Sequence, residues 1–174
     1  YYEDTIKSGA DVLVTEGLTD VLSALQAGYT SVTSPVTTRF RDKDGEKLLR
    51  ICKRVNKVFI INDAEENRSG EKGALITAQI LHEGGVRVFL GELPRPAGVV
   101  KVDVNSFVKD HGAAAFRAVV DAAKPYVQFL LDSLPSNIAP ADVSRELRPV
   151  MESLAFVDEI EKESWKKIIA TKFG

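Results

Sequence analysis

Four short apolar runs occur in the first part of the chain, and each predicts a β-strand. They cover residues 12–15, 29–33, 58–61 and 86–90. The run at 58–61, Val-Phe-Ile-Ile, does not alternate apolar and polar positions, which is typical of a strand buried on both faces. The segments between the runs carry apolar residues at helical spacing, with helices expected at 20–28, 44–56 and 71–83. This alternation predicts an α/β fold, a parallel sheet with helices on its faces.

The pattern changes near residue 112, where His111-Gly112 closes a helical turn. No further strand is predicted after it. Apolar spacing and the prolines between the segments predict helices at 113–123, 126–134, 141–153 and 157–171. We therefore expect two domains, an α/β domain at 1–112 and an all-helical subdomain at 113–174.

Length and composition restrict the possible classes of protein. The 174 residues suffice for one core and a small appendage. The one cysteine, Cys52, excludes a disulfide framework or a cysteine-based zinc cluster within the chain and suits a reducing compartment, so we expect a cytoplasmic location. We find no apolar run of transmembrane length and expect no signal peptide. Because the chain begins with Tyr1, we expect it to be a piece of a longer protein.

Acidic and amide side chains follow the first and third apolar runs and a short segment after the fourth run. They are Glu16 and Asp20, then Asp63 and Glu65, and finally Asp103 and Asn105. In open parallel sheets, the carboxyl ends of the strands form the ligand-binding edge. Clustered carboxylates repel one another unless a cation neutralises them, and an all-oxygen set without histidines favours Mg²⁺ or Mn²⁺ over zinc. A solvated acidic loop is the alternative interpretation of the group around Asp63.

A magnesium site of this kind suits phosphoryl or nucleotidyl transfer, in which the ion stabilises the attacking and leaving oxygens. Glu16, apart from the Asp63 and Glu65 pair, could act as a general base or bind a second ion. Arg68 and Lys72 flank the acidic loop and could contact triphosphate oxygens, or simply be surface charges. A basic stripe spaced for one helix face either is solvated or follows a nucleic acid backbone; it comprises Lys47, Arg50, Arg54 and Lys57.

Other reaction chemistries find little support in the sequence. There is no G-x-S-x-G motif and no Walker A motif. His82 and His111 lie far apart along the chain, and a lone helical histidine is usually structural. The apolar stripe of the helix at 44–56 includes Cys52, which we expect to be buried and inert.

Three motifs in this order resemble the Toprim domain, the catalytic module of bacterial-type primases and topoisomerases. They are Glu16-Gly17-x-x-Asp20, then Asp63-x-Glu65 followed by Gly70 and a helix, and Asp103-x-Asn105. Within that superfamily the chain is most similar to bacterial-type (DnaG-type) replicative primases. The segments 123–131 and 147–173 resemble the helical subdomain that follows Toprim in those enzymes. The resemblance covers nearly the whole chain from Asp11 onward.

The resemblance implies a Rossmann-like parallel four-stranded sheet with helices on both faces, followed by the helical subdomain. It implies RNA primer synthesis from nucleoside triphosphates on a single-stranded DNA template, with Mg²⁺ or Mn²⁺ as cofactor. A replicative helicase would bind through regions outside this chain. The implied catalytic residues are Glu16, Asp20 and Asp63, and the implied metal ligands are Asp63, Glu65, Asp103 and Asn105.

Two positions depart from the family pattern. Glu65 stands where the family usually has aspartate, and Asn105 stands where the primases usually have an acid. Both remain oxygen ligands, so metal binding is retained and the number of ions stays open. A plasmid- or virus-borne primase would suit this divergence. The alternatives are a Toprim nuclease, which uses the same ions to cut a phosphodiester, and a non-enzymatic module that binds nucleic acid or a partner.

Overall fold

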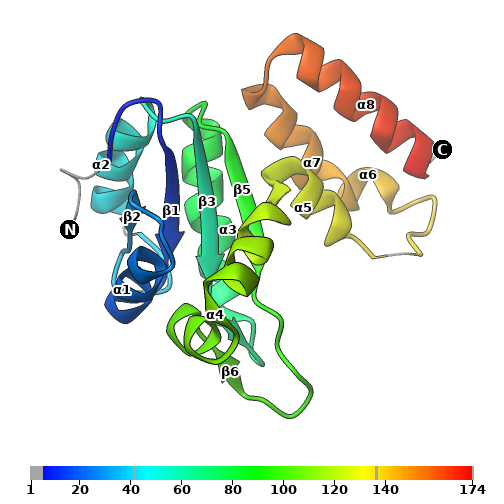
Figure 1. The fold of residues 1–174 in the computed structure, drawn as a ribbon. Coiled ribbons are helices and arrows are strands. Elements are labelled where there is room, and N and C mark those ends of the chain that lie inside the picture. Colours follow the sequence, from blue (N-terminus) through cyan, green and yellow to red (C-terminus); the bar gives the residue numbers. More distant parts are fainter. Residues whose placement is uncertain (1–5, 41, 136, 174) are drawn as a thin grey trace. The chain divides into compact units, whose positions relative to one another are not determined.

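The computed structural model describes residues 6–40, 42–135 and 137–173, and its first unit is built on a five-stranded sheet (Figure 1). The strand order is β2-β1-β3-β5-β7. Four strands are parallel, and β7 pairs antiparallel to β5. Their bounds are β1 Asp11–Thr15, β2 Val32–Thr33, β3 Lys57–Asn62, β5 Val88–Glu92 and β7 Lys124–Pro125. The predicted parallel four-stranded α/β sheet is confirmed, and β7 extends it beyond the prediction.

Two helices cover each face of this sheet (Figure 1). One face carries α1 and α4, and the other carries α2 and α3; their bounds are α1 Leu18–Gln26, α2 Asp42–Cys52, α3 Ser69–Glu83 and α4 Val104–Asp121. The unalternating run in β3 serves both faces, because Ile61 packs into the core under α1 and α4 while Val58 and Ile60 are buried on the opposite side. Cys52 is buried, as the sequence predicts.

A separate antiparallel ribbon of two strands lies beside the carboxyl edge of the sheet. It pairs β4, Ala64–Glu65, with β6, Lys101–Val102. These strands are short and far apart in the sequence, and neither was predicted. The ribbon connects the segment after β3 directly to the segment before α4, so it brings two of the three predicted acidic groups together.

The expected boundary at residue 112 falls inside α4, and the structure divides the chain later, after Pro125. Gly112 does break the helix, with φ 82° and ψ 170°, which is a left-handed backbone that favours glycine. The helix then resumes on the same face of the sheet, because Phe116 and Val120 belong to the core of the first unit. The residues from 113 to 125 thus belong to the α/β unit by packing.

The second unit, Tyr126–Gly174, is helical in its described part and has a core of its own. It contains α5 Tyr126–Asp132, α6 Val143–Glu146, α7 Arg148–Ser153, a 3₁₀ turn at Leu154–Phe156 and α8 Glu159–Phe173. The expected helix at 141–153 is split into α6 and α7. Trp165 is buried in this core, and its indole Nε1 donates to Glu161 at 3.1 Å. No helix in the described ranges has both the length and the apolar character needed to cross a bilayer.

Candidate functional site

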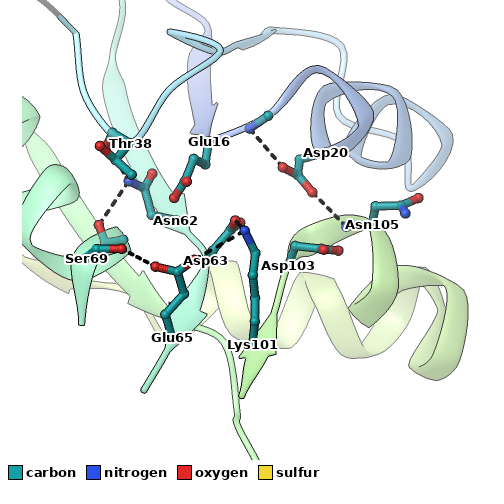
Figure 2. A network of polar contacts seen from close by, with 12 residues as sticks. Glu16, Asp20, Thr38, Asn62, Asp63, Glu65, Ser69, Lys101, Asp103 and Asn105 are labelled. Atoms are coloured by element: carbon teal, nitrogen blue, oxygen red, sulfur yellow. Dashed lines mark hydrogen bonds and ion pairs between the residues drawn. The ribbon is translucent and has the colours of Figure 1, made fainter. Parts of the chain in front are cut away.

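Parallel pairing of β1 with β3 brings the first two acidic groups to one edge of the sheet. Thr15 is in register with Ile61, so Glu16 and Asp63 follow immediately at adjacent strand ends. In Figure 2 the side chains of Glu16, Asp63, Glu65 and Lys101 direct their polar ends toward one another. Only 6% of Asp63 is exposed, which is unusual for a carboxylate. The carboxyl edge of this sheet therefore holds a compact group of charged side chains.

Glycine lets helix α3 begin directly against the end of β3. A Cβ on Gly70 would collide with the backbone carbonyl of Asp63. Asn62 secures the approach, since its Nδ2 donates to the carbonyls of Gly70 at 3.0 Å and Thr38 at 2.9 Å. Ser69 Oγ donates to the carboxylate of Glu65. The Gly70 position in the motif is thus explained by close packing of backbone on backbone.

The ribbon of β4 and β6 explains why four charged residues share one side. Glu65 is directly opposite Lys101, and continuing the register by one residue on each strand places Asp103 opposite Asp63. Since side chains two residues apart point the same way, both pairs lie on one face of the ribbon. Lys101 Nζ lies 2.6 Å from Asp63 Oδ2 and 3.3 Å from Glu65 Oε1. One ammonium group thus bridges two carboxylates.

Negative charge at the site is only partly compensated. Asp63 Oδ1 and Glu16 Oε2 are buried and have no hydrogen-bond partner. Burial, followed by the charge of Asp63, raises the pKa of Glu16 to about 7. Burial also raises the pKa of Asp63, although the hydrogen bond from Lys101 opposes that rise. The pKa of Glu65 is lowered, chiefly by the hydrogen bond from Ser69, and the pKa of Lys101 is raised, chiefly by its bond to Asp63.

Asp20 and Asn105 link two helices instead of facing Asp63. Asp20 accepts hydrogen bonds from the backbone N–H of Gly17 at 2.8 Å and from that of Asn105 at 2.9 Å. The amide oxygen of Asn105 accepts from Ser23 Oγ at 2.9 Å, so it is directed toward α1. Burial raises the pKa of Asp20, and these backbone bonds oppose the rise. The pair fixes the start of α1 against the start of α4.

Asp103 lies beside Lys101 and also caps α4 (Figure 2). Its Oδ1 accepts from the backbone N–H of Ser106 at 2.6 Å, and Ser106 Oγ lies 3.2 Å from the Asp103 backbone N–H in return. The carboxylate is half-buried and close enough to Asp63 to contribute to the raised pKa of that group. Asp103 therefore has a structural partner as well as a place in the acidic group.

The donor set has the chemistry that a hard divalent cation prefers: carboxylate oxygens, two of them buried without a partner. Within the described ranges, however, no group of three His, Cys, Asp or Glu side chains is arranged to hold a metal ion. The position between Asp63 and Glu65 is taken by the Lys101 ammonium. The side chains are therefore of the kind that binds a divalent cation, but the positive charge that contacts Asp63 and Glu65 in this structure is the Lys101 ammonium group.

The predicted basic residues do not all lie on one helix. Lys47 and Arg50 are exposed on α2, but α2 ends at Cys52, so Arg54 lies beyond it. Lys57 is the first residue of β3, so it lies at the opposite end of this strand from Asp63, and its Nζ lies 5.9 Å from the ring centroid of Phe59. The prediction of a single helix face is therefore wrong for these last two residues, because the strand begins where the helical spacing was extended.

Near the acidic loop, Arg68 is paired and Lys72 is exposed. Arg68 Nε lies 2.6 Å from Glu71 Oε2, a contact within the first turn of α3.

Lys101 was not among the predicted site residues, although the alternation Lys101-x-Asp103 beside Asp63-x-Glu65 is the signal that places it there. Recognising that signal requires knowledge that the two segments pair.

A model of the Toprim-like family matches residues 13–108. That range includes most of β1, all of β3, the ribbon and all three acidic motifs, and it covers more than half of the chain. The chain belongs to the Toprim-like family. The fold and the resemblance inferred from the sequence are thereby confirmed.

Curated relatives of this chain include DNA primases. The chain is 25% identical over 126 residues to the DNA primase of Chlamydia pneumoniae, and this alignment covers 72% of the chain and 20% of that protein. It is 26% identical over 161 residues to the DNA primase of Geobacillus stearothermophilus, covering 92% and 24%. A solved structure of the DnaG primase catalytic domain bound to single-stranded DNA shares the fold, with a TM-score of 0.73, 20% identity and coverage of 97% and 53%. The chain spans about a quarter of the length of these curated relatives.

Proposed function

We propose that this chain is the nucleotidyl-transfer core of a DNA primase, which synthesises RNA primers on a single-stranded DNA template. The observation that carries the proposal is the gathering of Glu16, Asp63 and Asp103 at the carboxyl edge of the sheet, with a buried oxygen of Asp63 unpartnered. The primase relatives support it. Since the chain spans only about a quarter of their length, template binding and initiation would draw on further regions.

In this proposal the acidic group holds Mg²⁺, or Mn²⁺, through Asp63, Glu65 and Asp103. When bound, the ion would offset the charge on the phosphate groups of the incoming nucleoside triphosphate. Glu16 is the proposed general base, because it lies beside Asp63 at the same edge. Asp20 and Asn105 are proposed as positioning residues, because their hydrogen bonds fix α1 against α4 and thereby set the places of Glu16 and Asp103.

Binding of nucleotide and template is assigned to the exposed cations. Lys72 lies on the first turns of α3 and is exposed, and Arg68 would have to exchange its contact with Glu71 for a triphosphate. Lys47 and Arg50 on α2 are proposed to contact the backbone of the template or the new primer, and Arg54 and Lys57, which lie outside α2, are proposed as separate phosphate contacts. A replicative helicase would bind elsewhere in the protein.

The experiment compares two reactions in the protein that carries this chain. It is incubated with Mg²⁺, single-stranded DNA and labelled nucleoside triphosphates, and separately with Mg²⁺ and labelled DNA alone. We expect short RNA products in the first reaction and intact DNA in the second, with Asp63→Asn as the matched inactive control. Cleaved DNA without primers would identify a Toprim nuclease instead. No reaction together with no binding of divalent ions would identify a non-enzymatic module.

A further inference from the structure

Lys101 is held at the acidic site by backbone pairing as well as by its side chain. It is the first residue of β6 and is directly opposite Glu65 of β4. Its side chain therefore leaves the ribbon on the face that also carries Asp63 and Glu65. The resulting distances are 2.6 Å from Nζ to Asp63 Oδ2 and 3.3 Å from Nζ to Glu65 Oε1. The ribbon thus delivers an ammonium group to the middle of the carboxylates.

The acidic group requires a cation in order to stay together. The Asp63 side chain is only 5% exposed, and Glu16, Asp20 and Asp103 all add negative charge close to it. Carboxylates at this spacing repel one another, and burial increases the repulsion because water no longer screens it. Lys101 is the cation that contacts Asp63 in the described part of the chain. It offsets one charge and leaves Asp63 Oδ1 and Glu16 Oε2 without partners.

We propose that Lys101 is the resident counter-ion of this site and that a divalent ion binds by displacing its ammonium from Asp63 and Glu65. This inference rests on the proposed function for the assignment of those two acids as ligands. An ammonium group donates to the same lone pairs that a divalent ion would occupy, so the two cations compete for one position. Lys101 sets the affinity of the site for metal and keeps the site folded in the absence of metal.

The surroundings of Lys101 provide room for the displaced side chain. The side chain is 43% exposed, and its four-carbon stem has freely rotating bonds. Beside it is an open groove of about 420 Å³, lined by Glu65, Glu66, Asn67, Val100 and Lys101 itself. Swinging into this groove would return the ammonium to water near Glu66, so displacement does not leave a buried unpaired charge. The exchange therefore requires only a rotamer change on a fixed backbone.

Titration with Mn²⁺, followed by electron paramagnetic resonance of the free ion, tests the competition directly. Lys101→Met keeps the apolar stem and removes the charge. We expect it to bind Mn²⁺ more tightly by about tenfold, the factor that corresponds to roughly one charge-assisted hydrogen bond that the ion no longer has to break. Lys109→Met is the matched control, because Lys109 is an exposed lysine on α4 and its loss makes the same change in net charge. We expect the control to leave Mn²⁺ affinity within about twofold of the parent.

Thermal unfolding gives a second readout that does not depend on catalysis. Without metal, Lys101→Met should unfold at a lower temperature than the parent, and saturating Mn²⁺ should raise its midpoint by more than it raises that of the parent. Lys101→Arg, which keeps the charge, should bind Mn²⁺ no more tightly than the parent and serves as the test if the methionine variant fails to fold.

Equal or weaker Mn²⁺ binding by Lys101→Met would overturn the proposal, and so would tighter binding by Lys101→Arg or an equal gain in the Lys109→Met control. Absence of Mn²⁺ binding by both the parent and Lys101→Met would overturn it as well. Failure of primer synthesis alone would refute the proposed reaction and leave the Mn²⁺ competition standing, so the two failures are distinguishable.

Discussion

Replacement of Asp63 by asparagine separates the catalytic role of this residue from its structural role. The substitution keeps the size of the side chain and one acceptor oxygen, and it removes the charge. Asp63 is fixed by the end of the buried strand β3 and by the close start of α3. In the parent, Oδ2 accepts from Lys101 at 2.6 Å, and Oδ1 is buried without a partner. The amide oxygen can keep the first contact, while the second position gains an N–H group.

The effect on stability without metal should be small because two terms oppose each other. Loss of the charge on Asp63 weakens the ion pair with Lys101; because the Lys101 side chain is 43% exposed, its ammonium can be solvated by water instead, and this limits the cost to about 1 kcal/mol. The same loss removes the repulsion between Asp63 and its neighbours Glu16 and Asp103, a contribution of similar size and opposite sign. We expect the free energy of unfolding to change by less than about 1 kcal/mol, or roughly 2–4 °C in the midpoint.

Catalysis should respond far more strongly than stability. A single electrostatic contact to the transition state is typically worth a factor of about 10² to 10³ in rate. We therefore expect primer synthesis by Asp63→Asn to fall by at least about 10² and the stabilisation by Mg²⁺ to disappear. The assays are primer synthesis on single-stranded DNA and thermal unfolding with and without Mg²⁺, with Asp110→Asn, an exposed aspartate of α4, as the matched control. Parental primer synthesis by Asp63→Asn would refute the assignment of Asp63 as a catalytic metal ligand.

Three further perturbations test other parts of the site. The pKa of Glu16 is raised from an ordinary 4.5 to about 7, so its contribution to stability is complete below pH 4.5 and is lost as the pH rises through about 7. Denaturation of the metal-free protein at about pH 5 and pH 8 should show this loss of stability, and Glu16→Gln should reduce the loss by about 1–2 kcal/mol after allowance for solvent screening. Gly70→Ala should destabilise the fold by about 1–3 kcal/mol in urea denaturation, since its methyl group meets the carbonyl of Asp63, and an unchanged midpoint would contradict the packing described for α3. Charge reversal of Lys47 and Arg50 together should weaken DNA binding and lower the slope of log affinity against log salt by about one for each phosphate that the protein no longer neutralises, whereas an unchanged slope would show that these residues are only solvated.

The sequence predicts the sheet well because its strands are marked by local signals. The unalternating run at 58–61 is typical of a strand buried on both faces, and the acids that follow it are therefore expected at the strand end. The ribbon of β4 and β6 was missed because each strand has two residues, and its pairing depends on contacts between distant segments. Lys101 was missed with it, since a lone lysine before an aspartate carries no signal until its cross-strand partner is known.

Local signals also misled in two places where packing decided the outcome. Gly112 has the backbone of a helix terminator, and the prediction ended the domain there, yet the apolar residues after it resume the same helix face against the sheet. Regular spacing suggested that the basic stripe on α2 continued to Lys57, but Val58 and the residues after it form a buried strand, so Lys57 begins β3. Helical spacing of charges does not by itself locate the end of a helix.

The position of β7 has a practical consequence for dissecting this protein. The family match ends at residue 108, but β7 at Lys124–Pro125 covers the outer edge of β5, and its proline offers no N–H to a further strand. A fragment cut at the end of the match would leave the outer edge of β5 unpaired, although β5 would still pair with β3, and it would remove Phe116 and Val120 from the core. The unpaired backbone N–H and C=O groups at that strand edge would promote self-association of the fragment. A soluble, well-behaved excised domain should therefore extend at least through Pro125.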